Sequence, residues 1–266
     1  MRSVPYLLVL NPRLEFKRKE ITMNNLKNTW RLLIAIPTFT LLSGIAMAQD
    51  SVYHVSRSMA TIPVDGKWDK PQWNEVAEVA LTNYMGEVPP FKPVTHAKMQ
   101  YDADNLYLIF RVQDRYVSSL VREPNGPVSR DACVEFFFSP DVQHPLHYFN
   151  LEINAGGTVL MRYNGAERKP FTDEDIAAFE VAHSLPKVVD PPINDPVTWT
   201  IECRIPLRVL EKYGTVTPPG AGIAWRANFY KTASKSTNPH YITWSPVQND
   251  VPNFHLPAYF GQLIFK

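Results

Sequence analysis

Polar side chains that could bind a hydroxyl-rich ligand recur at every second position along four short segments of the chain. The segments are residues 134–138, 149–154, 199–205 and 223–230, and in each the polar residues alternate with apolar ones. Side chains alternate between the two sides of a β-strand, so each segment predicts a strand with one core face and one polar face. If the strands pair, the polar faces merge into one surface that can hydrogen-bond a sugar. The alternative is an ordinary solvated sheet face.

The alternation selects particular residues for this surface. They are Glu135, Glu152, Asn154, Arg226 and Asn228. Glu135 has a second interpretation, as the partner of a neighbouring cation such as Arg226 or Arg204. Trp199 and Trp225 fall on the apolar sides of their strands and are expected in the core.

The N-terminal residues have the order of a secretory signal peptide. Lys27 and Arg31 precede an apolar run over residues 32–45, and the Ala-Met-Ala sequence of residues 46–48 ends it. A positive lead, a short apolar stretch and a small-x-small terminus are the three parts of such a signal. Pro37 interrupts the run, which is also short for a membrane span, so no membrane insertion is expected.

This interpretation divides the chain into two parts. Residues 1–48 are expected to be the signal peptide, with Met23 as an alternative start, and residues 49–266 to form a single domain. The length of the second part suits one large all-β domain. We expect this domain in the periplasm or outside the cell.

The composition favours an all-β domain and gives no reason to expect nucleic acid as a partner. The formal net charge is +1, and acidic and basic residues are mixed without blocks. The chain has 24 prolines, 11 glycines and 12% aromatic residues, which is typical of many strands joined by irregular loops. We predict an antiparallel two-sheet β-sandwich, similar to a jelly roll, with a few short helices.

Turn residues separate the expected elements. The strands are expected at residues 62–66, 96–101, 106–112, 133–138, 149–154, 159–163, 199–205, 223–231, 241–244 and 261–265. Short helices are expected at residues 68–79, 173–179 and 207–213.

The two cysteines predict free thiols. Cys203 falls on the apolar side of its strand, whereas Cys133 falls on the polar side. A disulfide is the alternative in an oxidising compartment, but nothing in the sequence brings the two sulfurs together.

Several motifs occur in the order that they have in one known family. The motifs are Ile62–Gly66 with Trp73, Tyr101-Asp102 with Leu106-Tyr107, Asp131 with Val134-Glu135, Trp199 with Glu202 and Ile205-Pro206, Trp244-Ser245-Pro246, and Tyr259–Leu263. From about Thr61 to Lys266 the chain resembles the family 9 carbohydrate-binding modules. The resemblance implies a β-sandwich that binds sugars without cleaving them, and some members carry structural calcium.

The resemblance also implies roles for three residues. Glu135 is at the position of a sugar-binding carboxylate, Asn228 is close to a polar sugar-binding position, and Phe254 is near one of two stacking tryptophans. Val128 stands where the second stacking tryptophan lies, so the two-sided clamp of the family is not retained. Either another aromatic residue, such as Tyr84 or Phe91, stacks on the sugar, or the site binds a different ligand.

Two acidic residues are candidates for a calcium site. Asp65 and Asp69 flank a glycine turn and could supply oxygen ligands to a structural calcium ion. Capping of the turn is the alternative role for both.

The expected function is that of a secreted, non-catalytic module that binds oligosaccharides or polysaccharides during polysaccharide utilisation. A haem b subunit of a periplasmic electron-transfer complex is the alternative, because similar sandwiches bind haem through methionine and histidine. The available ligands would be Met99, Met161, His96, His144 and His147. A glycoside hydrolase, with Glu135 paired to Glu152 or Asp131, is a third interpretation. The sequence contains no Ser-His-Asp signature, no His-Glu-x-x-His motif and no phosphate loop.

Overall fold

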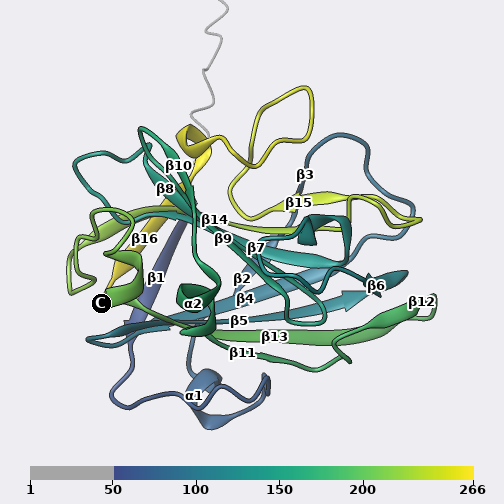
Figure 1. Ribbon diagram of the computed structural model, residues 1–266, viewed down its shortest axis with the longest axis horizontal. Helices are drawn as coiled ribbons and strands as arrows, with labels where there is room; N and C mark the ends of the chain where they lie inside the picture. The colour runs from purple at the N-terminus through teal and green to yellow at the C-terminus, as the bar shows by residue number, and fades with distance from the viewer. Residues whose placement is uncertain (1–50) are drawn as a thin grey trace, which may run out of the picture. The chain divides into compact units, whose positions relative to one another are not determined.

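The computed structural model describes residues 51–266, and the expected signal peptide, residues 1–48, lies outside this range. In the described residues the fold is the predicted β-sandwich with short helices, drawn in Figure 1. No helix among these residues has the length and apolar character needed to cross a bilayer.

Two antiparallel sheets form the sandwich. The first sheet has the order β10 (Arg168–Pro170), β9 (Val159–Asn164), β8 (Tyr148–Asn154), β7 (Cys133–Ser139), β14 (Ala224–Thr232) and β16 (Gly261–Phe265), and β15 (Tyr241–Thr243) and β3 (Asn83–Tyr84) extend it beside β14. The second sheet consists of β2 (Val79–Leu81), β4 (Val94–Tyr101), β5 (Asn105–Asp114), β13 (Val197–Pro206) and β11 (Glu180–His183).

One strand belongs to both sheets. The first four residues of β1 (Val52–Arg57) pair with β16, and its last two residues pair with β4, in parallel in both cases. Outside the two layers, β6 (Val117–Ser119) and β12 (Val189–Ile193) form a short ribbon. The helical segments are α1 (Pro71–Asn74), α2 (Asp173–Ala177), α3 (Leu207–Leu210), η1 (Val128–Arg130) and η2 (Pro257–Tyr259).

The hydrophobic core lies between the sheets and is rich in aromatic rings. Phe229 of β14 meets Phe110 of β5 with ring centroids 6.1 Å apart, so side chains of the two layers are in direct contact. Phe136 and Phe138 of β7 stack at 4.7 Å on the same inner face. This face is the one that the alternation of β7 predicts, because residues two apart lie on the same side of a strand.

The outer face of the second sheet is covered by residues 62–76. Trp68 and Trp73 from this segment are buried against Tyr107 and Ile109 of β5. In Figure 1 the α1 segment lies beneath this sheet. Glu202 of β13, expected on an exposed polar face, is therefore buried.

The outer face of the first sheet is covered by residues 245–260. Phe254 and Phe260 from this loop pack on Phe137, Tyr148 and Tyr230 of the sheet. Every residue of β7 and β8 is buried as a result, on both faces. The expectation of exposed polar faces on these strands is wrong, because a distant part of the chain supplies the cover.

The four polar segments also do not form one surface. Strands β7, β8 and β14 are neighbours in the first sheet, but β13, which carries Glu202 and Arg204, belongs to the second sheet. Arg204 contacts Glu180 of β11. Three of the four polar faces therefore merge, and the fourth lies on the opposite side of the sandwich.

Cys133 and Cys203 are both free and both buried. Cys203 is in the core between the sheets, and Cys133 lies beneath η1 with Val128 and Leu160. The prediction of free thiols is confirmed.

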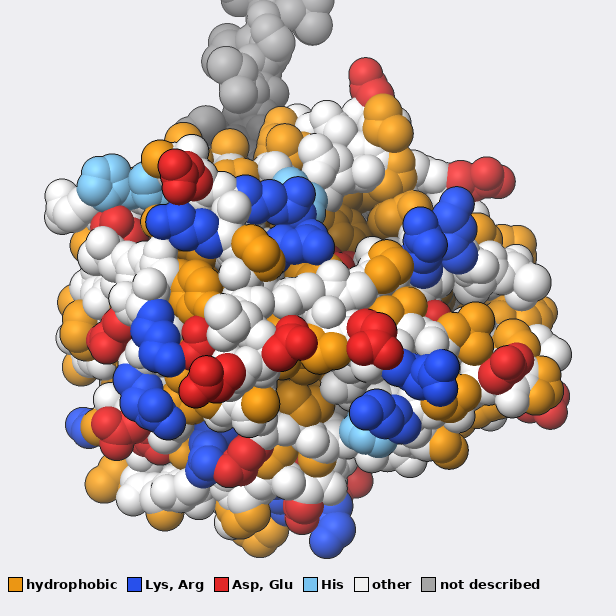
Figure 2. Space-filling view, in the orientation of Figure 1, with side chains coloured by type: hydrophobic (Ala, Val, Ile, Leu, Met, Phe, Trp, Pro, Cys, Tyr) orange, Lys and Arg blue, Asp and Glu red, His pale blue; other side chains and the backbone are white. Residues whose placement is uncertain are grey.

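On the face of the molecule shown in Figure 2, acidic and basic side chains are interspersed.

Candidate functional site

The outer face of the first sheet places two glutamates side by side. Glu135 of β7 is paired with Glu152 of β8 on one side and with Tyr230 of β14 on the other. Directly opposite residues on one sheet face have Cβ atoms about 4.5–5.5 Å apart. The strand register therefore brings the two carboxyl groups together, as the alternation predicts.

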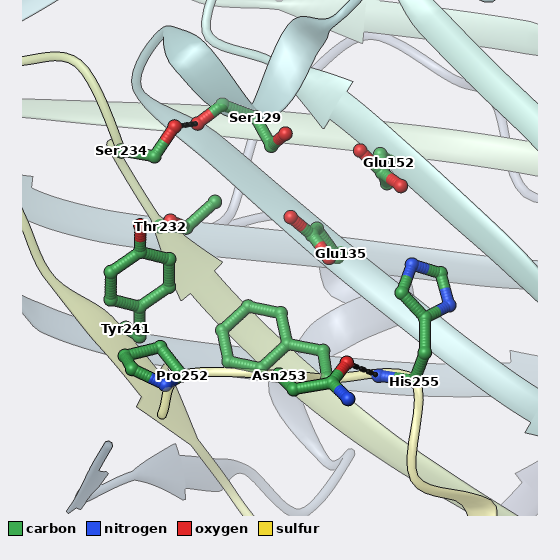
Figure 3. Close-up of a pocket in the computed structure, with 10 residues that line it drawn as sticks. Ser129, Glu135, Glu152, Thr232, Ser234, Tyr241, Pro252, Asn253 and His255 are labelled. Atoms are coloured by element: carbon green, nitrogen blue, oxygen red, sulfur yellow. Dashed lines mark hydrogen bonds between the residues drawn. The ribbon is translucent and has the colours of Figure 1, made fainter. Parts of the chain in front are cut away.

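A cavity of about 240 Å³ opens above this pair. Its lining comes from the sheet, from η1 and from the loop around Phe254, as Figure 3 shows. The lining residues are Ser129, Glu135, Glu152, Thr232, Ser234, Tyr241, Pro252, Asn253, Phe254 and His255. We call this cavity the glutamate pocket.

The carboxyl group of Glu135 reaches the pocket without a hydrogen-bonding partner among residues 51–266. Its side chain is 2% exposed, and no hydrogen bond from another described lining residue reaches it in Figure 3. Glu152 accepts one hydrogen bond, from Asn150 Nδ2 at 3.0 Å. Buried polar groups are normally hydrogen-bonded, so unused acceptors facing a cavity indicate a site for a polar ligand.

Burial shifts the pKa of both carboxyl groups upward. Loss of solvation, and next the charge of Glu152, raise the pKa of Glu135 well above its ordinary value. Loss of solvation raises the pKa of Glu152 to about 6, against the opposing charge of Arg162 and the hydrogen bond from Asn150. The pair therefore retains a proton near neutral pH, and a protonated carboxyl group can donate as well as accept a hydrogen bond.

Aromatic side chains form one wall of the pocket. Phe254 stacks on Tyr230 with ring centroids 4.1 Å apart and meets Tyr241 edge-on at 5.9 Å. Beside them, His255 Nδ1 lies 2.8 Å from the Tyr148 hydroxyl. Loss of solvation, together with Arg168 and Arg162, lowers the pKa of His255 to about 4, so its imidazole is neutral at pH 7. An apolar ring face beside hydrogen-bonding groups suits a sugar ring.

Three of the residues selected from the sequence are on the same sheet face but do not line the pocket. Asn228 is fully buried and exchanges hydrogen bonds with the backbone N–H and C=O of Ser245. Asn154 donates to Asp131 and accepts from the Thr158 backbone. These side chains fasten loops to the sheet, so the structure gives them a structural role.

Arg226 is the third of these residues. Its guanidinium group donates to the carbonyl oxygens of Ala258 and Phe260, which hold η2 against the sheet. Glu135, Glu152 and Phe254 are thus the sequence-selected residues that come together at the pocket. The sequence did not indicate the other lining residues as ligands. For Tyr241 it gave only a place in the short expected strand over residues 241–244.

Val128, which stands at the place of a stacking tryptophan, is buried against Cys133 and Leu160. Tyr84 and Phe91 are not among the lining residues of the pocket. Tyr241 is instead the second aromatic ring there. The pocket therefore has two aromatic rings on one wall and no clamp from two opposite sides.

The calcium candidates, Asp65 and Asp69, are not among the residues that line the glutamate pocket. Asp65 pairs with Lys70 at 2.9 Å and with Lys67 at 3.4 Å, and the hydrogen bond from Lys70 is the main reason that the pKa of Asp65 falls to about 2. Within residues 51–266, Asp65 and Asp69 are not part of any group of three acidic, histidine or cysteine ligands. Two lysines beside Asp65 leave little electrostatic reason for a cation there.

The methionines and histidines considered as haem ligands lie in different parts of the structure. Met99 and Met161 are fully buried in the hydrophobic core. His96 lies 3.2 Å from Glu78, while His144 and His147 belong to the loop between β7 and β8.

Comparison with known sequences identifies the family. Residues 62–265 match the sequence profile of carbohydrate-binding family 9. The chain belongs to carbohydrate-binding family 9. The resemblance drawn from the ordered motifs is confirmed, and the match includes both glutamates of the pocket and Phe254.

Relatives of this family 9 module are known from sequence and from structure. An "Extracellular protein" of Arthroderma benhamiae is 26% identical over 209 residues, which cover 73% of this chain and 86% of that protein. The crystal structure of a candidate carbohydrate-binding protein from Bacteroides uniformis has a TM-score of 0.72 and 26% identity, covering 82% of this chain and all of the other.

Two further structures show the same fold at lower identity. A family 9 carbohydrate-binding module from Caldicellulosiruptor kristjanssonii, solved with cellotriose and with glucose, has a TM-score of 0.56 and 16% identity in both cases. The alignments cover 81% of this chain and 94% and 96% of the two solved chains. They support the β-sandwich assignment.

Proposed function

We propose that this family 9 module binds one saccharide unit in the glutamate pocket, outside the cytoplasm, and does not cleave it. The observation that carries the proposal is the buried carboxyl group of Glu135, which faces a cavity and has no hydrogen-bonding partner within the described part of the chain. A hydroxyl group of a sugar would supply the hydrogen bond that Glu135 lacks.

The two sides of the pocket suit the two sides of a sugar. Glu135 and Glu152 can bond hydroxyl groups on the floor, while Phe254 and Tyr241 contact the apolar C–H face of the ring. A cavity of about 240 Å³ is smaller than the ~300–1,000 Å³ sites that enclose drug-sized ligands. We therefore propose that one ring enters, either a free monosaccharide or the end of a chain.

Calorimetric titration with glucose and with cellotriose tests the proposal, because these sugars accompany the solved relatives. Replacing Glu135→Ala removes the hydrogen-bonding group from the floor of the pocket. We expect the affinity to fall about tenfold, since each neutral hydrogen bond contributes ~0.5–1.5 kcal/mol and the protonated carboxyl group can both donate and accept one. Glu211→Ala, at an exposed position outside the pocket, is the matched control and is expected to bind like the parent.

Two results would contradict the proposal. One is an unchanged affinity of the Glu135→Ala variant, and the other is a glycan array on which the parent protein binds no sugar. Neither depends on loss of the fold, provided that the variant melts like the parent.

The carboxyl pair is also what a glycosidase would use. Overnight incubation with cellotriose followed by chromatography separates binding from cleavage, and we expect intact trisaccharide. Release of glucose would show catalysis by the pair.

An absorption spectrum of the same preparation tests the haem alternative, and no Soret band is expected.

Export is the remaining part of the proposal. The signal-like sequence of residues 1–48 and the relative named an extracellular protein support it. Mass spectrometry of protein recovered outside the cytoplasm is expected to give an N-terminus at Gln49.

A further inference from the structure

The loop between β7 and β8 carries three potential metal ligands at spacings of three residues. They are Asp141, His144 and His147. One ligand atom from each lies within 4.8 Å of the others, and this group is the only one of its kind among residues 51–266. None of the three lines the glutamate pocket.

Asp141 is held in place by the loop itself. Its Oδ1 accepts hydrogen bonds from the backbone N–H groups of Gln143 and His144, at 3.0 and 3.2 Å. Its Oδ2 points at His144 Nδ1, 2.9 Å away. The side chain is 7% exposed, so a carboxylate oxygen is fixed toward the histidines by a buried anchor.

The two histidines differ in how far neighbouring side chains fix the orientation of the ring. The His147 ring packs edge-on against Tyr163, whose hydroxyl lies 3.4 Å from His147 Nδ1. A contact of this kind orients the ring and leaves Nε2 for a metal ion. His144 is exposed over 63% of its side chain and stacks on His147 with centroids 5.2 Å apart. Rotation of His144 can close the group around an ion.

We propose that Asp141, His144 and His147 form a binding site for Zn²⁺, with the fourth position open to water. Two imidazoles and one carboxylate are a donor set that zinc accepts, whereas calcium requires oxygen ligands. Tetrahedral ligands at zinc distances of ~2.0–2.1 Å lie about 3.4 Å apart, so ligand atoms within 4.8 Å of one another must approach by about 1.4 Å at most.

Such an ion would sit at the start of β8. His147 directly precedes Tyr148, and the Tyr148 hydroxyl contacts His255 at the wall of the glutamate pocket. The zinc site is nevertheless separate from the proposed sugar site, so each can be tested without the other.

Calorimetric titration of the chelator-treated full chain with Zn²⁺ tests the proposal. We expect one equivalent to bind the parent protein. His144→Ala is the first variant, because this exposed side chain contributes little to packing, and we expect its zinc affinity to be at least about tenfold lower. His54→Ala, at another exposed histidine, is the matched control and is expected to bind like the parent.

Titration with Co²⁺ gives an independent readout. Tetrahedral cobalt bound to this donor set is expected to produce intense visible absorption bands that His144→Ala loses and His54→Ala keeps. Absence of zinc binding by the parent, or equal zinc affinities of the parent and His144→Ala, would overturn the proposal. Equal binding of Ca²⁺ and Zn²⁺ by the parent would do the same.

Discussion

Glu135 and Glu152 face each other in a place where a folded protein normally puts apolar or hydrogen-bonded side chains. Both are more than 90% buried, and together they have one hydrogen bond, from Asn150. Burial raises the pKa of both carboxyl groups, and a carboxyl group with a raised pKa lowers the stability of the fold once the pH exceeds its ordinary pKa. The arrangement therefore has a measurable consequence for stability as well as for binding.

The first prediction concerns Glu152→Gln. The pKa of Glu152 is about 6 in the folded protein and 4.5 ordinarily, so the folded state binds more protons between these values. Stability then falls as pH rises from 4.5 to 6, and the loss remains above pH 6. Because glutamine does not ionise, we expect the variant to gain on the order of 2 kcal/mol at pH 7 and nothing at pH 4. Urea unfolding at the two pH values measures this, and no gain at pH 7 would contradict it.

The second prediction concerns the thiols. Burial raises the pKa of Cys133 well above its ordinary value and does the same for Cys203. A thiolate is the reactive form, and neither sulfur is exposed. We expect iodoacetamide at pH 8 to leave both cysteines unmodified in the native protein and to modify both in urea. Mass spectrometry counts the added groups, and native labelling of either residue would contradict the structure.

At the scale of residues, the sequence predicts which side of a strand a residue occupies but not what covers it. The alternation correctly put Glu135, Glu152, Asn154 and Asn228 on one face. The Asn228 side chain donates a hydrogen bond to Ser245, which follows it by 17 residues. The Asn154 side chain donates one to Asp131, which precedes it by 23 residues. Nothing local distinguishes such a side chain from the free Glu135, because the distinction depends on tertiary contacts.

At the scale of elements, the most instructive case is the segment over residues 62–76. Its pattern predicted a helix over residues 68–79, but only α1 (Pro71–Asn74) forms. Helices this short are not stable alone, so tertiary anchors determine the conformation. Trp73 Nε1 donates to Glu202 at 2.8 Å, and Lys70 forms an ion pair with the same carboxylate at 2.7 Å. The backbone N–H groups of Asp65 and Gly66 also donate to Glu202.

The third prediction follows from these contacts. Glu202→Gln removes the charge that opposes the buried Lys70 ammonium, and breaking a buried ion pair typically destabilises a protein by ~3–5 kcal/mol. Asp65 remains as a second partner, so we expect a loss of about 3 kcal/mol in the unfolding free energy. Urea unfolding followed by tryptophan fluorescence measures it.

Glu180→Gln is the matched control for Glu202→Gln. Glu180 pairs with Arg204 on the same outer face of the second sheet, but the pair is exposed and is expected to contribute less than ~1 kcal/mol. Equal losses for the two variants would mean that Glu202 does not anchor the covering segment.

The strands themselves are easier to predict than this segment, because the period-two alternation of β7, β8, β13 and β14 is enforced by the core on one side.

At the scale of the whole molecule, the sandwich has an aromatic core between two sheets and an added layer on each outer face. Each added layer covers polar side chains as well as apolar ones, and this produces buried ionisable groups. Glu135 and Glu152 lie on one outer face, and His240 lies near the edge of the first sheet, 2.8 Å from Lys231 Nζ. Lys231 in turn pairs with Asp114 of the second sheet at 3.1 Å.

These groups oppose each other in the pH dependence of stability. Loss of solvation, and next the charge of Lys231, lower the pKa of His240 from 6.5 to about 3. The unfolded state therefore binds more protons between pH 3 and 6.5, and His240 makes stability fall as pH decreases. Glu135 and Glu152 have raised pKa values, so they make stability rise as pH decreases. Each group changes the unfolding free energy by up to about 1.4 kcal/mol per pH unit where only one of the two states is protonated.

The fourth prediction separates the two effects with the double variant Glu135→Gln/Glu152→Gln. His255, whose pKa is lowered to about 4, acts in the same direction as His240. In the parent the glutamates offset the two histidines between pH 4.5 and 6.5, so we expect a shallow pH profile of the melting temperature. Without the glutamates this offset is lost, and the double variant should lose stability more steeply as pH falls through this range. Glu123→Gln/Glu211→Gln, at two exposed positions, removes the same formal charge and is expected to keep the shallow profile. If the pocket variant and this surface variant have parallel profiles, the pocket glutamates do not titrate as the structure indicates, and net charge alone accounts for the change.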